Sequence, residues 1–158
     1  MIYCPLFVFD LDGTIANLDH RLHFIKQKKP DYERFLKEAV YDTPIEWIIS
    51  LMKRITDSQR TGKILILSGR METVRDETAL WLEKYSIPFD FLVMRPAKNH
   101  EPDEVLKIKM LREFLEGWKK EYFEFIVEFI VDDRQKVVDM WRREGFNCLQ
   151  CNAWKEWK

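Results

Sequence analysis

The sequence predicts an α/β fold of the doubly wound class, with a mostly parallel five-stranded sheet between two layers of helices. Two observations predict it. Short, continuous apolar runs recur along the chain, as in strands that are buried on both faces. Helical patterns separate these runs, and such alternation favours right-handed crossovers and parallel pairing. The length of 158 residues is that of about one domain.

The predicted strands are the apolar runs bounded by turn or charged residues. They cover residues 6–9, 64–67, 91–94 and 126–131, with a fifth candidate at 146–150. The predicted helices cover residues 45 to about 60, 72–85, 103 to about 120, and 135–144, the last of which is stopped by Gly145. Four tryptophans fall on apolar helix faces, where we expect them to pack in the core: Trp47, Trp81, Trp118 and Trp141.

One segment, residues 15–42, interrupts the regular alternation after the first strand. It contains Arg21 between His20 and His23, a basic tract at 26–29, and an amphipathic helix pattern over 32–40. We expect it to form a small insertion, or minimal cap, over the carboxyl edge of the sheet, within a single domain that spans residues 1–158. Its lysines could contact a nucleic-acid backbone, although a short basic run is more often a solvated loop.

Composition and charge exclude several classes of protein. With 46% hydrophobic and 34% charged residues, the chain is neither disordered nor of low complexity. The 26 Lys and Arg residues balance 27 Asp and Glu, so any nucleic-acid contact must use a local patch. The apolar run near the N-terminus is too short for a signal peptide or a bilayer span, so we expect a cytoplasmic protein without a membrane partner. Cys148 and Cys151 form a lone C-x-x-C, which favours ordinary thiols over a zinc or redox site.

Polar side chains follow the predicted strands at the point where each strand ends. Because open parallel sheets bind ligands outside the carboxyl ends of their strands, we expect these side chains to line one crevice. Gly13 allows the backbone to turn away after the first strand end. In chain order, the strand ends carry Asp10 and Asp12, then Ser68-Gly69-Arg70, then Arg95, then Asp132-Asp133.

The carboxylates of this crevice predict a metal centre that supports phosphoryl transfer. The alternation of an extended chain points Asp10 and Asp12 to the same side. Together with Asp132 and Asp133 they would bind a hard divalent cation, and oxygen ligands with room for water favour Mg²⁺. A carboxylate beside Mg²⁺ can attack phosphorus, and a second carboxylate can act as general acid and base. Ser68, neighbouring backbone N–H groups and a lysine could bind the phosphate oxygens.

Lys107 is the candidate lysine, because it interrupts the apolar stripe of the helix that begins near Asp103. A lysine is costly to bury without a partner. Asp103 lies four residues earlier on the same helix face and could hold the ammonium group. Spacing alone leaves two interpretations open, a functional lysine or a solvated salt bridge near a helix end.

These residues resemble the four ordered motifs of the haloacid dehalogenase-like (HAD) phosphatase superfamily, over essentially the whole chain. The motifs are Asp10-Leu11-Asp12-Gly13-Thr14, Ser68-Gly69-Arg70, Lys107 and Asp132-Asp133. Within the superfamily, the chain is most similar to the 3′-phosphatase domain of bacteriophage polynucleotide kinase-phosphatases. That similarity rests on Arg21, Arg70, the Asp103 and Lys107 pair, Asp132-Asp133, and the sequence that continues to residue 143.

The resemblance implies a HAD-like, Rossmannoid sheet and a role for each matching residue. Asp10 would be the nucleophile, Asp12 the general acid and base, and Ser68 and Lys107 the phosphate ligands. The Mg²⁺ site would comprise Asp10, the backbone carbonyl of Asp12, and the Asp132-Asp133 pair. The remaining set would contact the substrate or its phosphate: Arg21, Arg70, Asp103, Gly69 and Thr14. From its position alone, Arg21 could also be a solvated charge in the insertion.

The resemblance implies a Mg²⁺-dependent phosphomonoesterase that forms an aspartyl-phosphate and removes 3′-phosphates from DNA or RNA ends. The insertion is too short for a closed lid, and an open crevice would admit the end of a polymer. We expect no kinase activity, because no G-x-x-x-x-G-K-[ST] loop occurs. Two alternatives remain: a small-molecule phosphatase such as a 5′- or 3′-nucleotidase, and a catalytically silent module that binds nucleic-acid ends or a protein partner.

Overall fold

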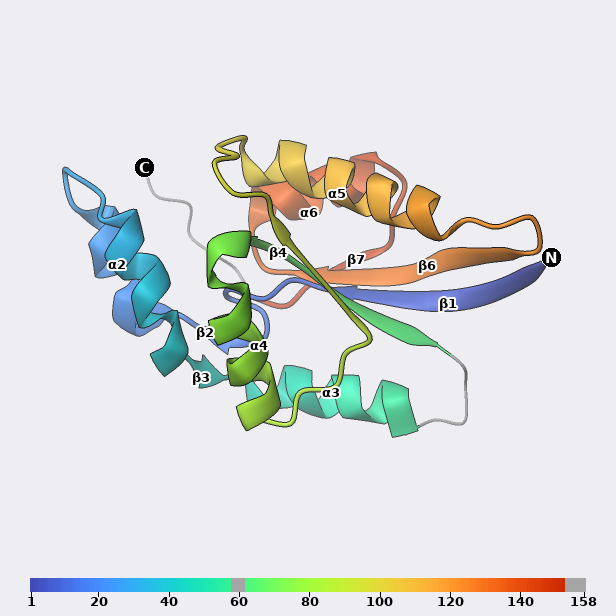
Figure 1. The fold of residues 1–158 in the computed structure, drawn as a ribbon, viewed down its shortest axis with the longest axis horizontal. Helices are drawn as coiled ribbons and strands as arrows, with labels where there is room; N and C mark the ends of the chain where they lie inside the picture. The colour runs from blue at the N-terminus through green and yellow to red at the C-terminus, as the bar shows by residue number, and fades with distance from the viewer. Residues whose placement is uncertain (58–61, 153–158) are drawn as a thin grey trace.

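The computed structural model describes residues 1–57 and 62–152. Its centre is a sheet of five parallel strands in the order β5-β4-β1-β6-β7. Helices cover both faces, with α3 and α4 on one side and α5 and α6 on the other (Figure 1). The predicted doubly wound α/β fold is therefore confirmed. The strands are β1 (Ile2–Phe9), β4 (Lys63–Met71), β5 (Phe91–Arg95), β6 (Phe123–Asp132) and β7 (Cys148–Gln150).

The strands differ from the predicted apolar runs mainly at their ends. β1 begins at Ile2, because its first residues pair with β6 alone. Pro5, which has no N–H to donate, is tolerated there because pairing with β4 starts only at Leu6. β4 continues through Ser68-Gly69-Arg70, with a shift of register against β5 between Ser68 and Met71. This motif therefore lies within the strand rather than in a loop after it.

The crossover helices match the predicted patterns with shorter ends. They are α3 (Glu46–Asp57), α4 (Arg75–Lys84), α5 (Asp103–Trp118) and α6 (Gln135–Arg143). The expected end of α3 near Arg60 lies outside the described residues. A 3-10 turn, η3 (Glu72–Val74), takes the first part of the helix expected from residue 72. Gly145, with a φ of 88°, follows α6 as predicted.

Two hydrophobic clusters, one on each face of the sheet, fix the strands and helices. Leu6, Val8 and Leu65 pack with α5 and α6, whereas Phe9, Ile64 and Ile66 pack with α3 and α4. The two thiols of the C-x-x-C divide between these clusters, with Cys148 in the first and Cys151 against the second.

The expectation that four tryptophans are buried in the core holds for only two of them. Trp81 and Trp141 are buried. Trp47 is 57% exposed, because α3 packs through Ile48, Ile49 and Met52 and leaves Trp47 beside this contact face. Trp118 is the last residue of α5 and is 43% exposed. Its indole ring packs against the Phe91 ring.

The insertion of residues 15–42 lies beyond the carboxyl ends of the strands, at the left in Figure 1. The helix expected over 32–40 divides into an α-helix and a 3-10 turn. The N-cap of this α-helix is Asp31, whose side chain accepts a hydrogen bond from the Arg34 N–H at 3.0 Å. The elements are β2 (Ala16–Asn17), η1 (Asp19–Arg21), α1 (His23–Lys26), α2 (Tyr32–Lys37) and η2 (Glu38–Tyr41), followed by β3 (Thr43–Pro44), which pairs antiparallel with β2. Across the described ranges, no helix is both long and apolar enough to cross a membrane.

Candidate active site

Three buried carboxylates, the carboxylate cluster Asp10, Asp132 and Asp133, meet where β1 and β6 end. Asp10 directly follows β1, whereas Asp132 is the last residue of β6. Parallel pairing sets Phe9 beside Val131 and therefore brings the next residues of the two strands together. One oxygen from each of the three side chains lies within 4.8 Å of the others. The carboxyl ends of β1 and β6 therefore bring the three predicted acids together.

Lys107 reaches this cluster from α5. Its Nζ donates to Asp10 Oδ1 at 2.7 Å and to Asp132 Oδ2 at 2.8 Å. The side chain is only 2% exposed, so the interpretation as a solvated salt bridge is wrong. The two carboxylates raise the pKa of Lys107 above its usual value, although burial alone would lower it. Lys107 therefore carries its positive charge into the interior.

The expected pairing of Lys107 with Asp103 is also wrong. Asp103 instead accepts hydrogen bonds from Arg95, at the end of β5, and from Arg134, which directly follows Asp133 in the chain. The reason is geometric: the first turn of α5 places Asp103 beside these guanidinium groups, while Lys107 lies within reach of two buried carboxylates. Long-range partners replace the contact one turn away on the same helix.

The donor set of the carboxylate cluster fits a hard divalent cation. Asp133 Oδ2 is buried and has no hydrogen-bond partner among the described residues. Burial, reinforced by the neighbouring carboxylates, raises the pKa of Asp10 to about 7 and that of Asp133 to about 9. The Thr14 hydroxyl lies 3.3 Å from Asp10 Oδ2 and 3.5 Å from Asp133 Oδ1, so it lines this cluster rather than a separate subsite. A cation bound here would receive oxygen ligands and relieve the repulsion among the three acids.

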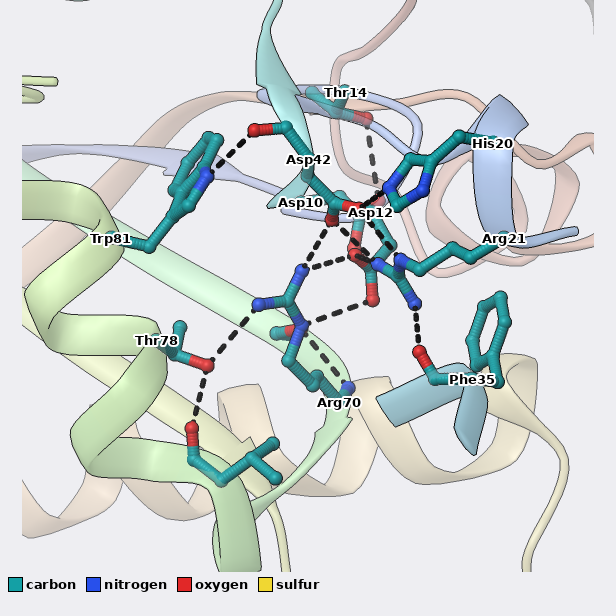
Figure 2. A network of polar contacts seen from close by, with 12 residues as sticks. Asp10, Asp12, Thr14, His20, Arg21, Phe35, Asp42, Arg70, Thr78 and Trp81 are labelled. Carbon is teal, nitrogen blue, oxygen red and sulfur yellow. Dashed lines mark hydrogen bonds and ion pairs between the residues drawn. The ribbon is translucent and has the colours of Figure 1, made fainter. Parts of the chain in front are cut away.

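A second set of charges, the guanidinium network of Asp12, Arg21, Asp42 and Arg70, lies next to the cluster (Figure 2). Asp12 Oδ1 accepts from Arg21 Nη2 at 2.6 Å and from Arg70 Nη2 at 2.5 Å. Burial alone would raise the pKa of Asp12, but the guanidinium groups of Arg70 and Arg21 hold it well below its usual value. Arg21 is fully buried, so its interpretation as a solvated charge is wrong.

Each guanidinium of the network is also held from its own side of the crevice. Arg21 Nη1 donates to the Phe35 carbonyl at 3.1 Å, and the guanidinium carbon lies 4.2 Å from the centre of the Phe35 ring. Arg70 Nη1 donates to Thr78 Oγ1 at 3.2 Å, and Thr78 in turn donates to the Val74 carbonyl. The insertion thus fixes one guanidinium, and α4 fixes the other.

Sequence reasoning missed Asp42, the acid that joins the two guanidinium groups. Asp42 is fully buried between η2 and β3. Its carboxylate accepts from Arg21 Nε and Nη2, both at 2.7 Å, and from Arg70 Nη2 at 3.1 Å. In the sequence it precedes Thr43-Pro44 and is indistinguishable from an ordinary turn residue, so no local pattern marks it.

The other predicted residues of β4 make no described hydrogen bond to the carboxylate cluster. Ser68 Oγ is buried and accepts from the Arg70 N–H at 3.0 Å. The Gly69 carbonyl accepts from Arg95 Nε at 2.8 Å. A Cβ atom at Gly69 would lie 2.7 Å from Asp103 Oδ1, so a larger residue there would displace the Asp103 carboxylate.

A family comparison decides the identity of this arrangement. The family model described as the polynucleotide kinase PNKP phosphatase domain matches residues 5–154. The chain belongs to this family. The predicted resemblance to HAD-like phosphatases is confirmed, and so is the assignment of the chain to the phosphatases.

Individual relatives of this phosphatase domain agree with the family match. A putative bifunctional polynucleotide kinase/RNA ligase of Autographa californica nuclear polyhedrosis virus is 28% identical over 137 residues, which make up 84% of this chain and 17% of that protein. A chain in a structure of the Pnkp1/Rnl/Hen1 complex superposes with a TM-score of 0.79 at 30% identity, over 97% of this chain and 47% of that one. This chain therefore spans less than half the length of these relatives.

A more distant structure shows the shared fold. A haloacid dehalogenase-like family hydrolase of Streptococcus pneumoniae superposes with a TM-score of 0.65 at 16% identity. The superposition covers 93% of this chain and 84% of that one. Both chains therefore have the HAD-like architecture.

Proposed function

We propose that this chain is a Mg²⁺-dependent polynucleotide 3′-phosphatase that acts through an aspartyl-phosphate. One observation carries the proposal. Asp10 belongs to the carboxylate cluster and accepts a hydrogen bond from Lys107, and Asp12, two residues later, accepts hydrogen bonds from two guanidinium groups. A nucleophile, an acid and base, and cations for the phosphoryl oxygens thereby meet at one crevice. The complete set favours catalysis over a silent binding module.

The chemistry proceeds in two displacements at phosphorus. An Asp10 carboxylate oxygen attacks phosphorus, the bond from phosphorus to the 3′ oxygen breaks, and Asp12 gives that oxygen a proton. Water then loses a proton to Asp12 and attacks phosphorus, and the bond to Asp10 breaks. The products are an alcohol, inorganic phosphate and the regenerated carboxylate.

The proposed chemistry requires Asp12 to carry a proton, although Arg21 and Arg70 keep it ionised in the structure. Binding of the phosphoryl group would remove this obstacle. Arg21 and Arg70 are the groups nearest to Asp12 that a phosphoryl dianion would attract. When the phosphoryl oxygens take over these donors, Asp12 loses the contacts that keep it ionised. The same two arginines then stabilise the negative charge of the transition state, together with Lys107.

The Mg²⁺ would be held by Asp10, Asp132, Asp133 and the backbone carbonyl of Asp12. Bound there, it would neutralise phosphoryl charge and make phosphorus more susceptible to attack. The oxygen-only donor set and the unpartnered Asp133 Oδ2 support this choice of cation. Ser68 contributes a phosphate contact in this proposal, from a hydroxyl that already supports the Arg70 backbone.

The names of the matching family and relatives support polynucleotide ends as the substrate. The family model and the viral relative carry the name polynucleotide kinase, and one solved relative, 32% identical, is part of a Pnkp1/Rnl/Hen1 RNA repair complex. DNA or RNA ends with a 3′-phosphate are therefore the proposed partners, within nucleic-acid repair.

The experiment measures phosphate release from 3′-phosphorylated DNA and RNA oligonucleotides. Matched 5′-phosphorylated oligonucleotides and 3′- and 5′-mononucleotides serve as competing substrates, EDTA replaces Mg²⁺ in one arm, and Asp10→Asn is the blank. Release that is fastest from 3′-phosphorylated oligonucleotides and requires Mg²⁺ supports the proposal. Turnover of mononucleotides alone would instead make the chain a nucleotidase with the same catalytic centre.

A further inference from the structure

Asp42 is a buried acid that the proposed chemistry does not use. It is 0% exposed, yet it forms charge-assisted hydrogen bonds to both arginines of the guanidinium network. The His20 ring also contacts Asp42 Oδ1, at 2.9 Å. A buried carboxylate with this many charged partners has a fixed orientation, because each partner restrains the plane of the carboxylate.

The backbone of Asp42 is hydrogen-bonded to helix α4. Trp81 of α4 donates its Nε1–H to the Asp42 carbonyl at 2.9 Å (Figure 2). Arg21 comes from the insertion and Arg70 from β4, so Asp42 links two parts of the fold that each supply one guanidinium. Asp42 is thereby held against both arginines, whose Nη2 groups donate to Asp42 and to Asp12.

We propose that Asp42 is a positioning residue, which aims Arg21 and Arg70 at one point and offsets part of their positive charge so that phosphate can leave. The point of convergence is visible in the structure, because both Nη2 groups lie within 2.6 Å of the same oxygen, Asp12 Oδ1. This inference rests on the proposed function, in which the same two Nη2 groups bind the phosphoryl oxygens.

The charge balance predicts effects of opposite sign on phosphate affinity and on turnover. The network contains two guanidinium groups and two carboxylates, so it is neutral when both acids are ionised. Removal of the Asp42 charge leaves one positive charge unbalanced in a buried site, which strengthens the attraction of an anion. It also removes one of the two carboxylate oxygens that accept from the guanidinium groups, so the donors are less well aimed during the reaction. Phosphate should bind more tightly while turnover falls.

The experiment compares Asp42→Asn, which removes the charge, with Asp42→Glu, which keeps the charge but moves it. The matched control is Glu38→Gln, a charge removal in the same insertion at a residue outside the network. We measure kcat on an aryl phosphate, the inhibition constant of inorganic phosphate, and the rise in melting temperature that inorganic phosphate causes with Mg²⁺ present.

For Asp42→Asn we expect kcat to fall about 10-fold or more and phosphate to inhibit at about a third of the wild-type concentration or less. Asp42→Glu should lower kcat with the inhibition constant within about twofold of wild type, and Glu38→Gln should change neither. A lower kcat with unchanged or weaker phosphate binding in Asp42→Asn would overturn the proposal, because a purely structural role predicts that result. So would an unchanged kcat in Asp42→Glu, which decides the matter if the Asn variant does not fold.

The melting measurement separates this proposal from the function on which it rests. If wild-type protein releases no phosphate from any substrate, the proposed function fails, but the phosphate-induced rise in melting temperature still reports on Asp42. A larger rise in Asp42→Asn than in wild type supports the positioning role, and an equal or smaller rise contradicts it.

Discussion

The two sets of charges at the crevice differ in how far each is satisfied. The carboxylate cluster has three acids and a single ammonium, and it leaves the buried Asp133 Oδ2 without a partner among the described residues. The guanidinium network has equal numbers of acids and bases, and each guanidinium bonds to both Asp12 and Asp42. Binding of a cation stabilises the carboxylate cluster, because the cluster has excess negative charge. The guanidinium network is already neutral, so an anion binds there by replacing one that is present. A phosphate substrate would replace the Asp12 carboxylate on the two arginines.

Removal of the nucleophile should have the largest effect on activity. Asp10→Asn keeps the volume of the side chain but removes the nucleophilic carboxylate, so we expect turnover to fall at least ~10³-fold. Phosphate release from the 3′-phosphorylated oligonucleotide measures the change. The melting temperature without metal should be equal to or above that of wild type, because the cluster loses a repulsive charge. A variant that retains wild-type rates would contradict the assignment of Asp10.

Loss of the single cation of the cluster should rank second. Lys107→Ala should lower kcat about 10²-fold or more, since one charge-stabilising donor is worth that much. It should also lower the unfolding free energy by about 3 kcal/mol, because it leaves buried carboxylates unpaired. Lys109→Ala is the control: Lys109 is an exposed lysine of the same helix paired with Glu101, where we expect a loss of at most about 1 kcal/mol. Equal effects of the two substitutions would refute the role of Lys107.

The two arginines of the network should respond differently to the size of the substrate. Arg70→Ala should lower the rate on every substrate about 10²-fold, because Arg70 stabilises transition-state charge. Arg21 also binds the phosphoryl oxygens in the proposed function, but it comes from the insertion, so Arg21→Ala should lower the turnover of an aryl phosphate and lower that of oligonucleotides further. The ratio of kcat/KM for the two substrates measures this difference. An equal loss on both would assign Arg21 to the phosphate alone.

Metal binding should produce the smallest change, a pH-dependent gain in stability. The raised pKa values of Asp10 and Asp133, about 7 and 9, mean that these two side chains bind more protons in the folded protein than in the unfolded chain above pH ~4. The stability that these acids contribute is fully present below pH ~4 and is lost as the pH rises through 7 and 9.

Mg²⁺ binds the ionised acids, so the rise in melting temperature that it causes should grow between pH 5 and pH 8. Thermal melting with Mg²⁺ and with EDTA measures this effect, and Asp133→Asn should reduce it. A rise that is larger at pH 5 than at pH 8 would contradict the assignment of the cluster.

The fold and the carboxylate cluster could be predicted because each rests on a local pattern. Buried strands produce uninterrupted apolar runs, and a polar residue directly after such a run, such as Asp10 or Asp132, is unusual enough to indicate a site. Lys107 was found for the same reason, as a charge within an apolar helix face.

The partners of these charges could not be predicted, because they lie far away in the sequence. Asp103 and Lys107 have the spacing of a helical ion pair, yet each binds groups on other strand ends. Asp42 lies in a segment without periodicity, and its bonds join Arg21 and Arg70, 21 and 28 residues away. Only the assembled fold determines which charges meet.

The order of strands in the sheet also determines when the site can form during synthesis. β1 is made before the other strands of this sheet, and Phe9 must wait for Val131, about 120 residues later, before its pairing with β6 is complete. At a translation rate of about 5–20 residues per second, this delay is on the order of 10 s. During that time an apolar strand with an unpaired edge is exposed to other nascent chains. We expect the yield of folded protein in cells to depend on chaperones that cover β1 until β6 emerges.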